Sequence, residues 1–403
     1  MRWEGWLVPD YVALDLHRDY VHRCQLEPHP EGAKMRHSRF PNTREGWARF
    51  IETETGPQTW VAFEVTGNAF EVWDLLSPHV GRVLVAKASA AKEKGSGRKT
   101  DRADTERLVL GLAQGTLPAV WVPPKEVRDL RHLLQARRRT DSRRKAVGNQ
   151  LRAILRRNWI QVPTGTDVQA WIAAHPEALD ELGPADRILA LSALRQYEVL
   201  AQEVAALTAE VAARTEKEPR VQLLLSIPGV SLITAAHIYA YLGDPSRFPG
   251  PKQLTRYAGL DPSVHSSGER NRRGRTSKNG CKPLRTALIE AAHTVARYDT
   301  GPLGQFFARM RKKAGYHKSI VALARKLLIV AWRILLTGTS YHGARLETTQ
   351  RKVRHLERQA ARSRDWTVLR VQLLGGDTGD GVAAPGQTSQ RRRAPRKRTP
   401  VPA

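Results

Sequence analysis

The sequence predicts an α/β domain, then a long helical middle and a mainly α-helical C-terminal region. Short apolar strands alternate with amphipathic helices at the start, and apolar residues at helical spacing dominate the rest of the chain. A chain of 403 residues is long enough for two or three domains. We expect an α/β domain at 8–122, a helical, coiled-coil assembly region at 123–218, a C-terminal domain at 219–340, and a helical extension with a disordered basic tail at 341–403.

The elements of the first region follow in order from local patterns. Apolar runs predict strands, and the first two are separated only by a short polar stretch, which predicts a β-hairpin. Periodic apolar residues predict helices, one of which begins at Asp101 and ends near Gly115. In chain order we expect strands at 12–16, 20–26 and 60–67, a helix at 69–76, a strand at 82–86 and the helix from residue 101.

Two long helices are expected in the middle region. Residues 124–157 carry apolar side chains at helical spacing with arginines on the other faces, and the apolar positions of 190–215 nearly follow a heptad repeat. The pair predicts an antiparallel hairpin or an intermolecular coiled coil, and an ordinary helix bundle fits equally well. These helices are candidates for assembly into a dimer or tetramer.

The C-terminal region opens with VQLLLSIPGVSLITAAHIYAYLGD, which predicts a helix, a tight turn at Pro228-Gly229 and a second helix. Such a helix-hairpin-helix offers backbone N–H groups to a phosphate, so Gly229 is a candidate nucleic-acid contact. Two further helices are expected in CKPLRTALIEAAHTVARY and HKSIVALARKLLIVAWRILL. We assign the aromatic residues of the helices to the core rather than to base stacking.

The charge balance indicates a nucleic-acid partner. The formal net charge is +27 and the isoelectric point is about 10.7, and nucleic acid is the polyanion that most often balances such an excess. A membrane partner is the weaker alternative, since no segment has the apolar length to span a bilayer and the N-terminus lacks signal-peptide features. Cys24 and Cys281 are too isolated for a disulfide framework or a zinc site. A cytoplasmic, nucleoid-associated protein is expected.

Four acidic residues predict a metal site. Asp15 and Glu64 lie inside apolar strands, where an ionised group needs a partner, and Asp101 and Asp104 open a helix on one face. Together they suit Mg²⁺ (or Mn²⁺), and two such ions about 4 Å apart would serve phosphoryl transfer. Taken singly, each has a structural explanation: a paired strand acid, a salt bridge, a helix N-cap, or a first-turn acid favoured by the helix dipole.

The segment GLDPSVHSSGERNRRGRTSKNGCKPLR places two serines before a dense basic run. It is either a flexible basic loop or a nucleophile held where a phosphodiester lies. The basic side chains could grip a DNA backbone and the charge around an attacked phosphate; they are Arg270, Arg272, Arg273, Arg275 and Lys278. His265 is more readily a solvated loop histidine than a general base.

DLHRDYV, FEVTG and KTDRADTERL resemble the Asp, Glu, Asp, Asp signature of the DEDD transposases. The stretch from SIPGVSLITAAH through NGCKPLRTALIEAA is similar to the C-terminal transposase domain of the same proteins, the insertion-sequence transposases related to the Piv and MooV DNA invertases. The resemblance covers roughly residues 10–115 and 220–335. It implies a RuvC-like, RNase H fold for the N-terminal domain.

The resemblance also implies roles for individual residues. Asp15, Glu64, Asp101 and Asp104 would form the metal site. The serine of the SSG motif, placed on Ser267 with Ser266 as the fallback, would form a transient phosphoserine–DNA link during cleavage and rejoining. Some family members are guided by a structured noncoding RNA encoded by the element. One departure is ALDLHR, where the family commonly has a GIDVSK-like string, so a Gly and a small-residue/Lys turn beside Asp15 are lost.

Three functions therefore stand side by side. The preferred one is a transposase, a site-specific DNA recombinase that acts on the ends of an insertion element, in which both regions contribute to one active site and the chain forms oligomers. A RuvC-like, structure-selective nuclease would use the four acids and water, making Ser267 dispensable. A non-catalytic, nucleic-acid-binding architectural protein would bind without metal-dependent cleavage.

Overall fold

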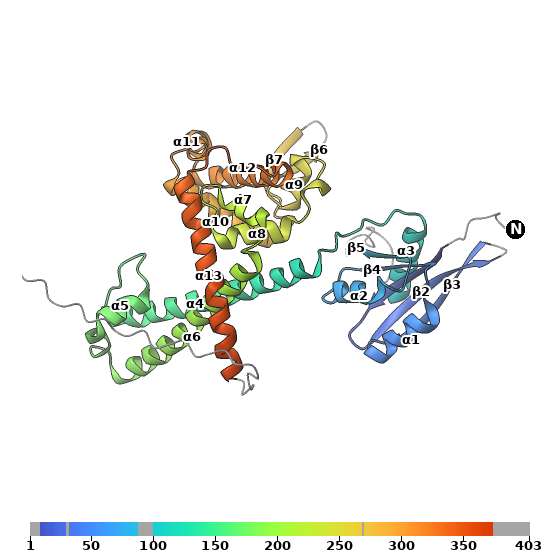
Figure 1. Cartoon of the computed structure of the whole chain (residues 1–403), viewed down its shortest axis with the longest axis horizontal. Coiled ribbons are helices and arrows are strands. Elements are labelled where there is room, and N and C mark those ends of the chain that lie inside the picture. The colour runs from blue at the N-terminus through green and yellow to red at the C-terminus, as the bar shows by residue number, and fades with distance from the viewer. Residues whose placement is uncertain (1–8, 30–31, 88–99, 268–269, 374–403) are drawn as a thin grey trace, which may run out of the picture. The chain divides into compact units, whose positions relative to one another are not determined.

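The computed structural model describes residues 9–29, 32–87, 100–267 and 270–373, without the side chains of 28–29, 32–33, 263–275 and 364–373. The chain divides into two compact units, Met1–Pro124 and Lys125–Ala403 (Figure 1). Among the described residues, every helix is too short or too polar to cross a membrane. The basic tail expected beyond residue 375 lies outside the described residues.

The first unit is built on a five-stranded sheet with the order β3-β2-β1-β4-β5. Strands β1, β2 and β3 pair antiparallel, whereas β1, β4 and β5 pair parallel. Parallel neighbours need a crossover connection, and two helices, α1 and α2, supply these connections. The bounds are β1 Asp10–Leu16, β2 Tyr20–His29, β3 Gly32–Pro41, α1 Arg44–Glu54, β4 Thr59–Glu64, α2 Ala69–Leu76, β5 Arg82–Ala86 and α3 Asp101–Ala113.

The two faces of this sheet carry different helices. Side chains alternate between faces along a strand, so Val12 and Leu14 pack into the core that contains α1 and α2. Ala13 and Ala62 point to the opposite face, where they pack against α3. The small alanines let α3 lie close to β1 and β4 (Figure 1). This mixed α/β arrangement is consistent with the RNase H-like domain that the sequence motifs imply.

Most of the predicted elements of this unit are confirmed. The hairpin, the strands at 60–67 and 82–86 and the two helices are present, with ends shifted by a few residues. The sequence patterns do not reveal β3 or α1. Strand β3 lies at the edge of the sheet and reads GAKMRHSRFP, which is too basic and too weakly alternating to register as a half-buried strand. Helix α1 buries only Trp47 and Phe50.

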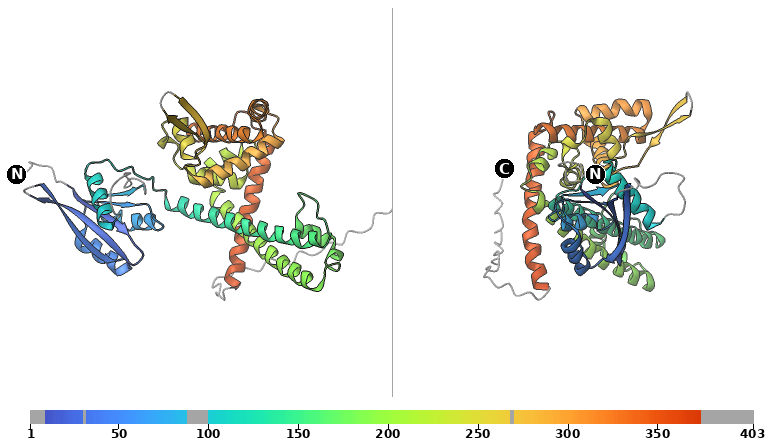
Figure 2. Two further views of the ribbon diagram at one scale, coloured as in Figure 1. Left: turned by 180° about the vertical axis from the view of Figure 1, so that it is seen from behind. Right: turned by 90° about the vertical axis from the view of Figure 1, so that its right-hand side faces the viewer.

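In the second unit, α4 (Lys125–Arg157) and α6 (Pro184–Thr215) lie side by side and run in opposite directions (Figure 2). Tyr197 of α6 joins them, since its hydroxyl lies 2.6 Å from Nη1 of Arg144 on α4. Helix α5 (Val168–Ala174) and a 3₁₀ turn (Pro176–Leu179) close one end around a small apolar core. Within the chain the two helices form the antiparallel hairpin, and their association with a second chain stays a prediction.

The rest of the second unit is a helical bundle around the largest core of the chain, with fully buried side chains such as Leu224, Ile238 and Leu328. The last helix, α13, crosses the α4–α6 pair (Figures 1 and 2). Helices predicted around 221–244, 281–298 and 317–336 are confirmed. The bounds are α7 Pro219–Leu225, α8 Leu232–Leu242, a 3₁₀ turn Pro245–Arg247, α9 Pro251–Tyr257, α10 Lys282–Tyr298, α11 Pro302–Ala314, α12 Tyr316–Thr337 and α13 Leu346–Leu373.

A two-stranded antiparallel sheet, β6 (Pro262–Ser267) and β7 (Arg270–Thr276), stands where the sequence patterns predict only a loop. The segment is rich in hydroxyl and basic residues, so it lacks the apolar alternation that marks a strand. Backbone pairing does not need that alternation, and Ser266 pairs with Asn271 and Ser267 with Arg270.

Candidate functional site

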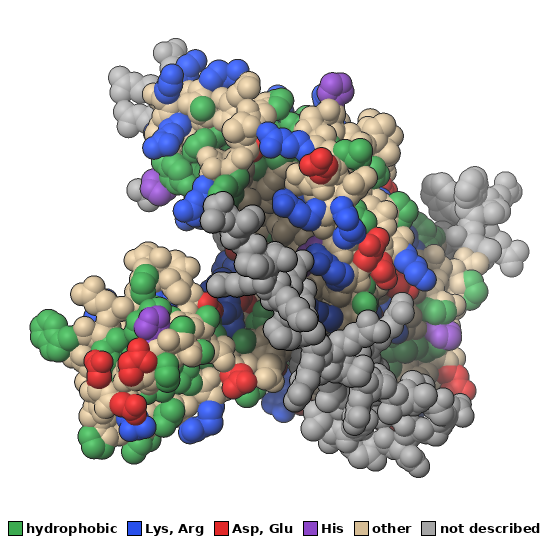
Figure 3. Space-filling view, turned by 60° about the vertical axis from the view of Figure 1, so that its left-hand side comes forward, with side chains coloured by type: hydrophobic (Ala, Val, Ile, Leu, Met, Phe, Trp, Pro, Cys, Tyr) green, Lys and Arg blue, Asp and Glu red, His purple; other side chains and the backbone are tan. Residues whose placement is uncertain are grey.

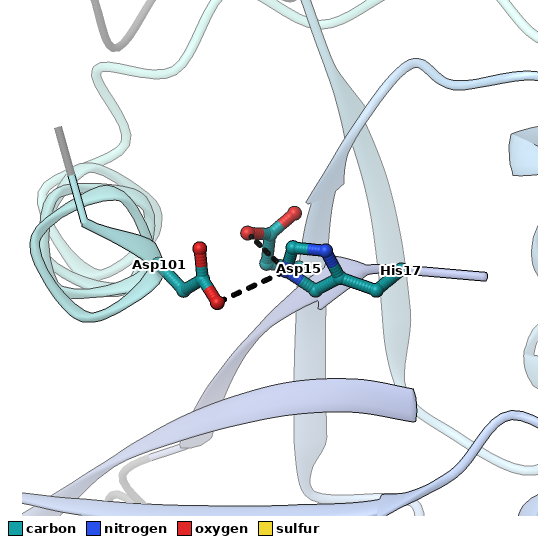
Figure 4. A group of neighbouring side chains, drawn as sticks. All are labelled: Asp15, His17 and Asp101. Atoms are coloured by element: carbon teal, nitrogen blue, oxygen red, sulfur yellow. Dashed lines mark ion pairs between the residues drawn. The ribbon is translucent and has the colours of Figure 1, made fainter. Parts of the chain in front are cut away.

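The first unit places two of the predicted acids beside each other. Asp15 is the next-to-last residue of β1, and Asp101 is the first residue of α3. The N-cap of α3 is Thr100, whose hydroxyl accepts a hydrogen bond from the Ala103 N–H. Asp101 is therefore not the capping residue, and its carboxylate is directed toward β1 instead (Figure 4).

His17 lies between these two carboxylates. Its Nε2 atom is 3.2 Å from Oδ2 of Asp15 and 3.2 Å from Oδ2 of Asp101 (Figure 4). Possible ligand atoms of the three residues all lie within 4.8 Å of one another. Each side chain is about one-third exposed, but Nε2 itself is buried and, among the described residues, makes no well-aligned hydrogen bond.

This geometry fits a divalent metal. Two carboxylates that face each other repel unless a cation lies between them, and hard divalent cations prefer carboxylate oxygens. A buried nitrogen that contacts both carboxylates without an aligned hydrogen bond adds a third donor to the set. The group is also open enough to admit a phosphate oxygen, since each side chain keeps about one-third of its surface exposed.

A polar shell orients Asp101. The Tyr20 hydroxyl donates a hydrogen bond to Asp101 Oδ2 at 3.0 Å, and the Tyr20 ring stacks on His17 with 4.5 Å between ring centres. Burial acts to raise the pKa of Asp101, but the Tyr20 hydrogen bond and the charges of His17, His22 and Arg39 together hold it below its usual range. The same hydrogen bond raises the pKa of Tyr20. At neutral pH the carboxylate is ionised and the phenol keeps its proton.

The other two predicted acids do not join this group. Asp104 forms an ion pair with Arg107 one turn along α3. Glu64 is the residue after Phe63, which pairs with Leu14, so Glu64 at the end of β4 lies level with Asp15, the next-to-last residue of the parallel neighbour β1. By strand alternation Glu64 shares the face of Ala62, against α3. The structure therefore brings Asp15 and Asp101 together with His17 and places Glu64 at the same edge of the sheet.

His17 is the residue of this group that the sequence motifs did not single out. The available signal is the departure of ALDLHR from the GIDVSK-like string, in which a small residue occupies the position of His17. In the sequence that departure indicates only the loss of a Gly and of a small-residue/Lys turn beside Asp15. In the structure it adds a nitrogen donor beside Asp15.

In the second unit, Gly229 occupies the turn between α7 and α8. Its φ is +73°, and a Cβ there would lie 2.5 Å from Cγ2 of Val295 and 2.8 Å from the carbonyl oxygen of Ala291. Glycine is thus required by the left-handed backbone and by the close packing of the turn against α10. Ser231 caps α8 by accepting a hydrogen bond from the Thr234 N–H.

The serine-bearing hairpin has an anchored base. The Ser277 N–H donates to the Asp261 carbonyl at 2.9 Å, and the Ser277 hydroxyl donates to the Asp261 carboxylate at 2.6 Å. The Cys281 N–H donates to the Tyr257 carbonyl at 2.7 Å. Ser266 and Ser267 end β6, and the predicted basic residues lie on β7 or just after it: Arg270, Arg272, Arg273, Arg275 and the exposed Lys278. His265 lies in β6, opposite Arg272, and not in a loop.

Comparison with known proteins adds to this geometry. A DEDD-class transposase model of IS110 elements matches residues 12–160, and a model described as the transposase IS116/IS110/IS902 family matches residues 221–308. Together they span more than half of the chain. The chain belongs to the IS110/IS116 family of transposases.

Individual relatives support the same family assignment. The transposase for insertion sequence element IS1328 of Yersinia enterocolitica is 25% identical over 336 residues, which cover 82% of this chain and 98% of the relative. The transposase for element IS1111A of Coxiella burnetii is 27% identical over 250 residues, covering 60% and 68%. The pilin gene-inverting protein of Moraxella lacunata is 35% identical over 118 residues, covering 29% and 37%.

The family assignment confirms the resemblance inferred from the motifs. As a member of a transposase family, the protein is an enzyme that cleaves and rejoins DNA. The first model spans all four acids and His17, whereas the second spans Gly229 and the whole serine-bearing hairpin. The DEDD class of the first model implies a divalent metal, and the Asp15–His17–Asp101 group is the candidate for it.

Proposed function

We propose that this transposase cleaves and rejoins the strands of an insertion element with a metal-binding acidic site and a serine nucleophile. The observation that carries the proposal is the convergence of Asp15 and Asp101, from β1 and α3, on the buried Nε2 of His17. No other group of three such donors is found among the described residues. The proposal gives the acids of the first unit and the serine of the second unit separate roles.

Asp15, Asp101 and His17 would hold the metal, a Mg²⁺ or Mn²⁺ ion, and Glu64 at the same sheet edge would be a further ligand. Asp104 would join only after leaving its ion pair with Arg107. When bound, the ion supplies Lewis-acid stabilisation of negative charge on the phosphoryl oxygens. Tyr20 keeps the Asp101 carboxylate oriented through its hydroxyl, and the stacked Tyr20 ring fixes the plane of His17.

Ser267 is the proposed nucleophile, with Ser266 as the fallback. Its Oγ would attack the phosphorus of a DNA strand, forming an O–P bond as the bond to the 3′ oxygen breaks. The serine proton would pass to a base, and the leaving 3′ oxygen would be protonated. Attack by a new 3′ hydroxyl would reverse these steps and free the serine. The position of Ser266 and Ser267 at the end of a strand with an anchored base supports this role.

Positive charge supports DNA as the substrate. Arg270, Arg272, Arg273, Arg275 and Lys278 would neutralise phosphates next to the attacked position. Lys and Arg side chains are frequent over the upper part of the face in Figure 3, where acidic side chains are fewer. We also infer a structured noncoding RNA partner, as the resemblance to the family implies. We infer a homo-oligomer, dimer or tetramer, because an element has two ends that must meet a target.

The decisive experiment is a trapping assay. Supercoiled DNA carrying the element ends is incubated with the protein and flanking RNA, with and without Mg²⁺, and a protein–DNA adduct is sought on denaturing gels. We expect a metal-dependent adduct that Ser267→Ala abolishes and Ser266→Ala retains. Metal-dependent nicking that survives Ser267→Ala without an adduct would instead indicate a nuclease that uses water, and binding without any cleavage would indicate an architectural protein.

A further inference from the structure

A second polar site lies in the bundle of the second unit, among α10, α11 and α12. It is a cavity of about 470 Å³ lined by His293, Thr294, Ala296, Arg297, Tyr298, Phe307, Arg311 and Tyr316. Its volume falls within the range of about 300–1,000 Å³ that is usual for small-molecule pockets. None of these residues takes part in the proposed cleavage chemistry.

Two tyrosine rings of this pocket face solvent. Tyr298 is 71% exposed and Tyr316 is 40% exposed, contrary to the expectation that the aromatic residues of the helices belong to the core. The Tyr316 ring is held in place, because its hydroxyl lies 2.9 Å from Nδ1 of His293 and its ring packs edge-on against Phe307. The two rings therefore offer aromatic surface that the fold does not use.

The backbone that carries Tyr298 is also fixed. Tyr298 ends α10, and the next residue, Asp299, accepts a hydrogen bond from the Gly304 N–H at 2.8 Å in the first turn of α11. A Cβ on Gly304 would lie 1.8 Å from the Asp299 carbonyl oxygen, so the corner between α10 and α11 closes tightly. An exposed ring on a rigid corner loses little freedom when a planar ligand stacks on it.

The pocket is positively charged. The guanidinium carbon of Arg297 lies 5.6 Å from the Tyr298 ring centre, and that of Arg311 lies 5.9 Å from the Tyr316 ring centre. No acidic side chain lines the pocket, and neither arginine has an ion-pair partner within the part of the chain that the structure describes. Lys312 and Lys313 extend the positive charge along the end of α11.

We propose that this pocket binds an unpaired nucleotide of a single-stranded nucleic acid. The base would stack on Tyr298 or Tyr316, and Arg297 and Arg311 would contact the flanking phosphates. Aromatic platforms beside basic side chains are the usual means of holding unpaired bases, whose faces are free, whereas bases in a duplex are covered by their neighbours. The inference deepens the proposed function, on which it rests for the presence of a nucleic-acid substrate.

The unpaired nucleotide could belong to a DNA strand opened at the cleavage site or to an RNA partner. The test therefore compares three labelled probes at one salt concentration with the full-length protein: a 20-nucleotide deoxythymidine oligomer, a 20-nucleotide uridine oligomer and a 20-base-pair DNA duplex. We expect Tyr298→Ala to weaken single-strand binding by about tenfold and duplex binding by less than about twofold. Tyr298→Phe should bind like the parent protein, because it keeps the ring.

A charge-matched pair separates a phosphate contact inside the pocket from general electrostatic attraction. Arg311→Gln and Arg309→Gln each remove one positive charge from α11, but only Arg311 lines the pocket, and Arg309 is exposed outside it. The inference expects Arg311→Gln to weaken the single-strand probes more than the duplex. Arg309→Gln should affect all three probes slightly and equally. A larger Tyr298→Ala effect on one single-stranded probe identifies the strand, RNA or DNA, that the pocket takes.

A crosslink keeps the test independent of variant folding. Irradiation of the unmodified protein with a 5-bromouracil-containing strand should label peptides that contain Tyr298 or Tyr316. Equal losses of duplex and single-strand binding in Tyr298→Ala, or crosslinks confined to other peptides, overturn the inference. Failure of the proposed function appears separately, because Ser267→Ala should keep Tyr298-dependent binding while losing the covalent adduct.

Discussion

The acidic site of the first unit and the serine hairpin of the second unit are built differently. Asp15 and Asp101 come from a strand and a helix that share a core, so their carboxylates meet because the sheet and α3 pack together. The two serines end one strand of a two-stranded ribbon, and backbone hydrogen bonds to Asp261 and Tyr257 anchor the base of that ribbon. A metal site needs fixed donor atoms, whereas a nucleophile that passes a DNA strand between partners needs a defined position and reach.

The largest expected effects distinguish the role of the acidic site in the first unit from that of the serine hairpin in the second unit. Asp15→Asn should reduce metal-dependent cleavage by more than about 100-fold, because even outer partners of metal ligands are worth about 10–100-fold. It should also remove metal binding measured by calorimetry. Ser267→Ala should abolish the covalent adduct and leave metal affinity unchanged. Loss of metal binding in Ser267→Ala would show that metal binding also depends on the serine hairpin.

The turn at Gly229 tests whether the two units are independent scaffolds. Gly229→Ala combines a left-handed backbone with clashes against Ala291 and Val295, so it should lower the free energy of unfolding of the second unit by about 2–4 kcal/mol. Gly315→Ala is the matched control, because Gly315 has φ +75° and a Cβ added there would meet no atom within 4 Å; it should cost about 1 kcal/mol.

Denaturant unfolding, followed with two probes, measures the free energy of unfolding of the two glycine variants. Metal binding by the first unit should be unaffected in both glycine variants. Equal destabilisation by Gly229→Ala and Gly315→Ala would mean that the turn does not depend on its packing against α10.

Substitution of His17 tests whether its imidazole nitrogen is a metal ligand in the acidic site. Imidazole nitrogen suits transition metals better than magnesium, so His17→Ser should weaken Mn²⁺ binding by about tenfold and change Mg²⁺ binding by less than about twofold. Electron paramagnetic resonance of Mn²⁺ and competition with Mg²⁺ provide the readout in the absence of DNA. An equal loss for both ions would show that His17 supports the carboxylates without binding metal.

The smallest effect is a pH dependence of the second unit. Lys352 of α13 donates to the carbonyls of Leu225 and Ile227 at 2.9 and 2.8 Å, and burial lowers its pKa to about 8. The unfolded chain keeps this proton up to about pH 10.4. Between about pH 8 and 10.4 the unfolded state therefore binds more protons, and the Lys352 contribution to stability rises with pH.

The Lys352 prediction is checked by NMR titration of the reductively methylated lysine and by unfolding at several pH values. Lys352→Met should flatten the slope in this window, whereas Lys326→Met on α12 should not. A Lys352 pKa near its ordinary value would contradict the prediction.

Much of the fold could be predicted because its signals are local. Apolar runs and helical periodicity located β1, β2, β4, β5 and the long helices, since burial imposes those patterns on neighbouring residues. Strand β3 and the β6–β7 ribbon were missed because backbone pairing to a partner strand stabilises them without an apolar pattern. Helix α11 buries only Leu303 and Phe307, which is too few to mark it.

The sequence by itself determined the family motifs, the acids Asp15 in β1 and Glu64 in β4, and the serines before a basic run. These features depend on residue identity and short spacing. Only the tertiary structure decided which donors meet. It paired Asp15 and Asp101 around His17 and left Tyr298 exposed at the corner between α10 and α11. These outcomes depend on the packing of α3 on the sheet and of α10 on α11, contacts between segments that no local pattern specifies.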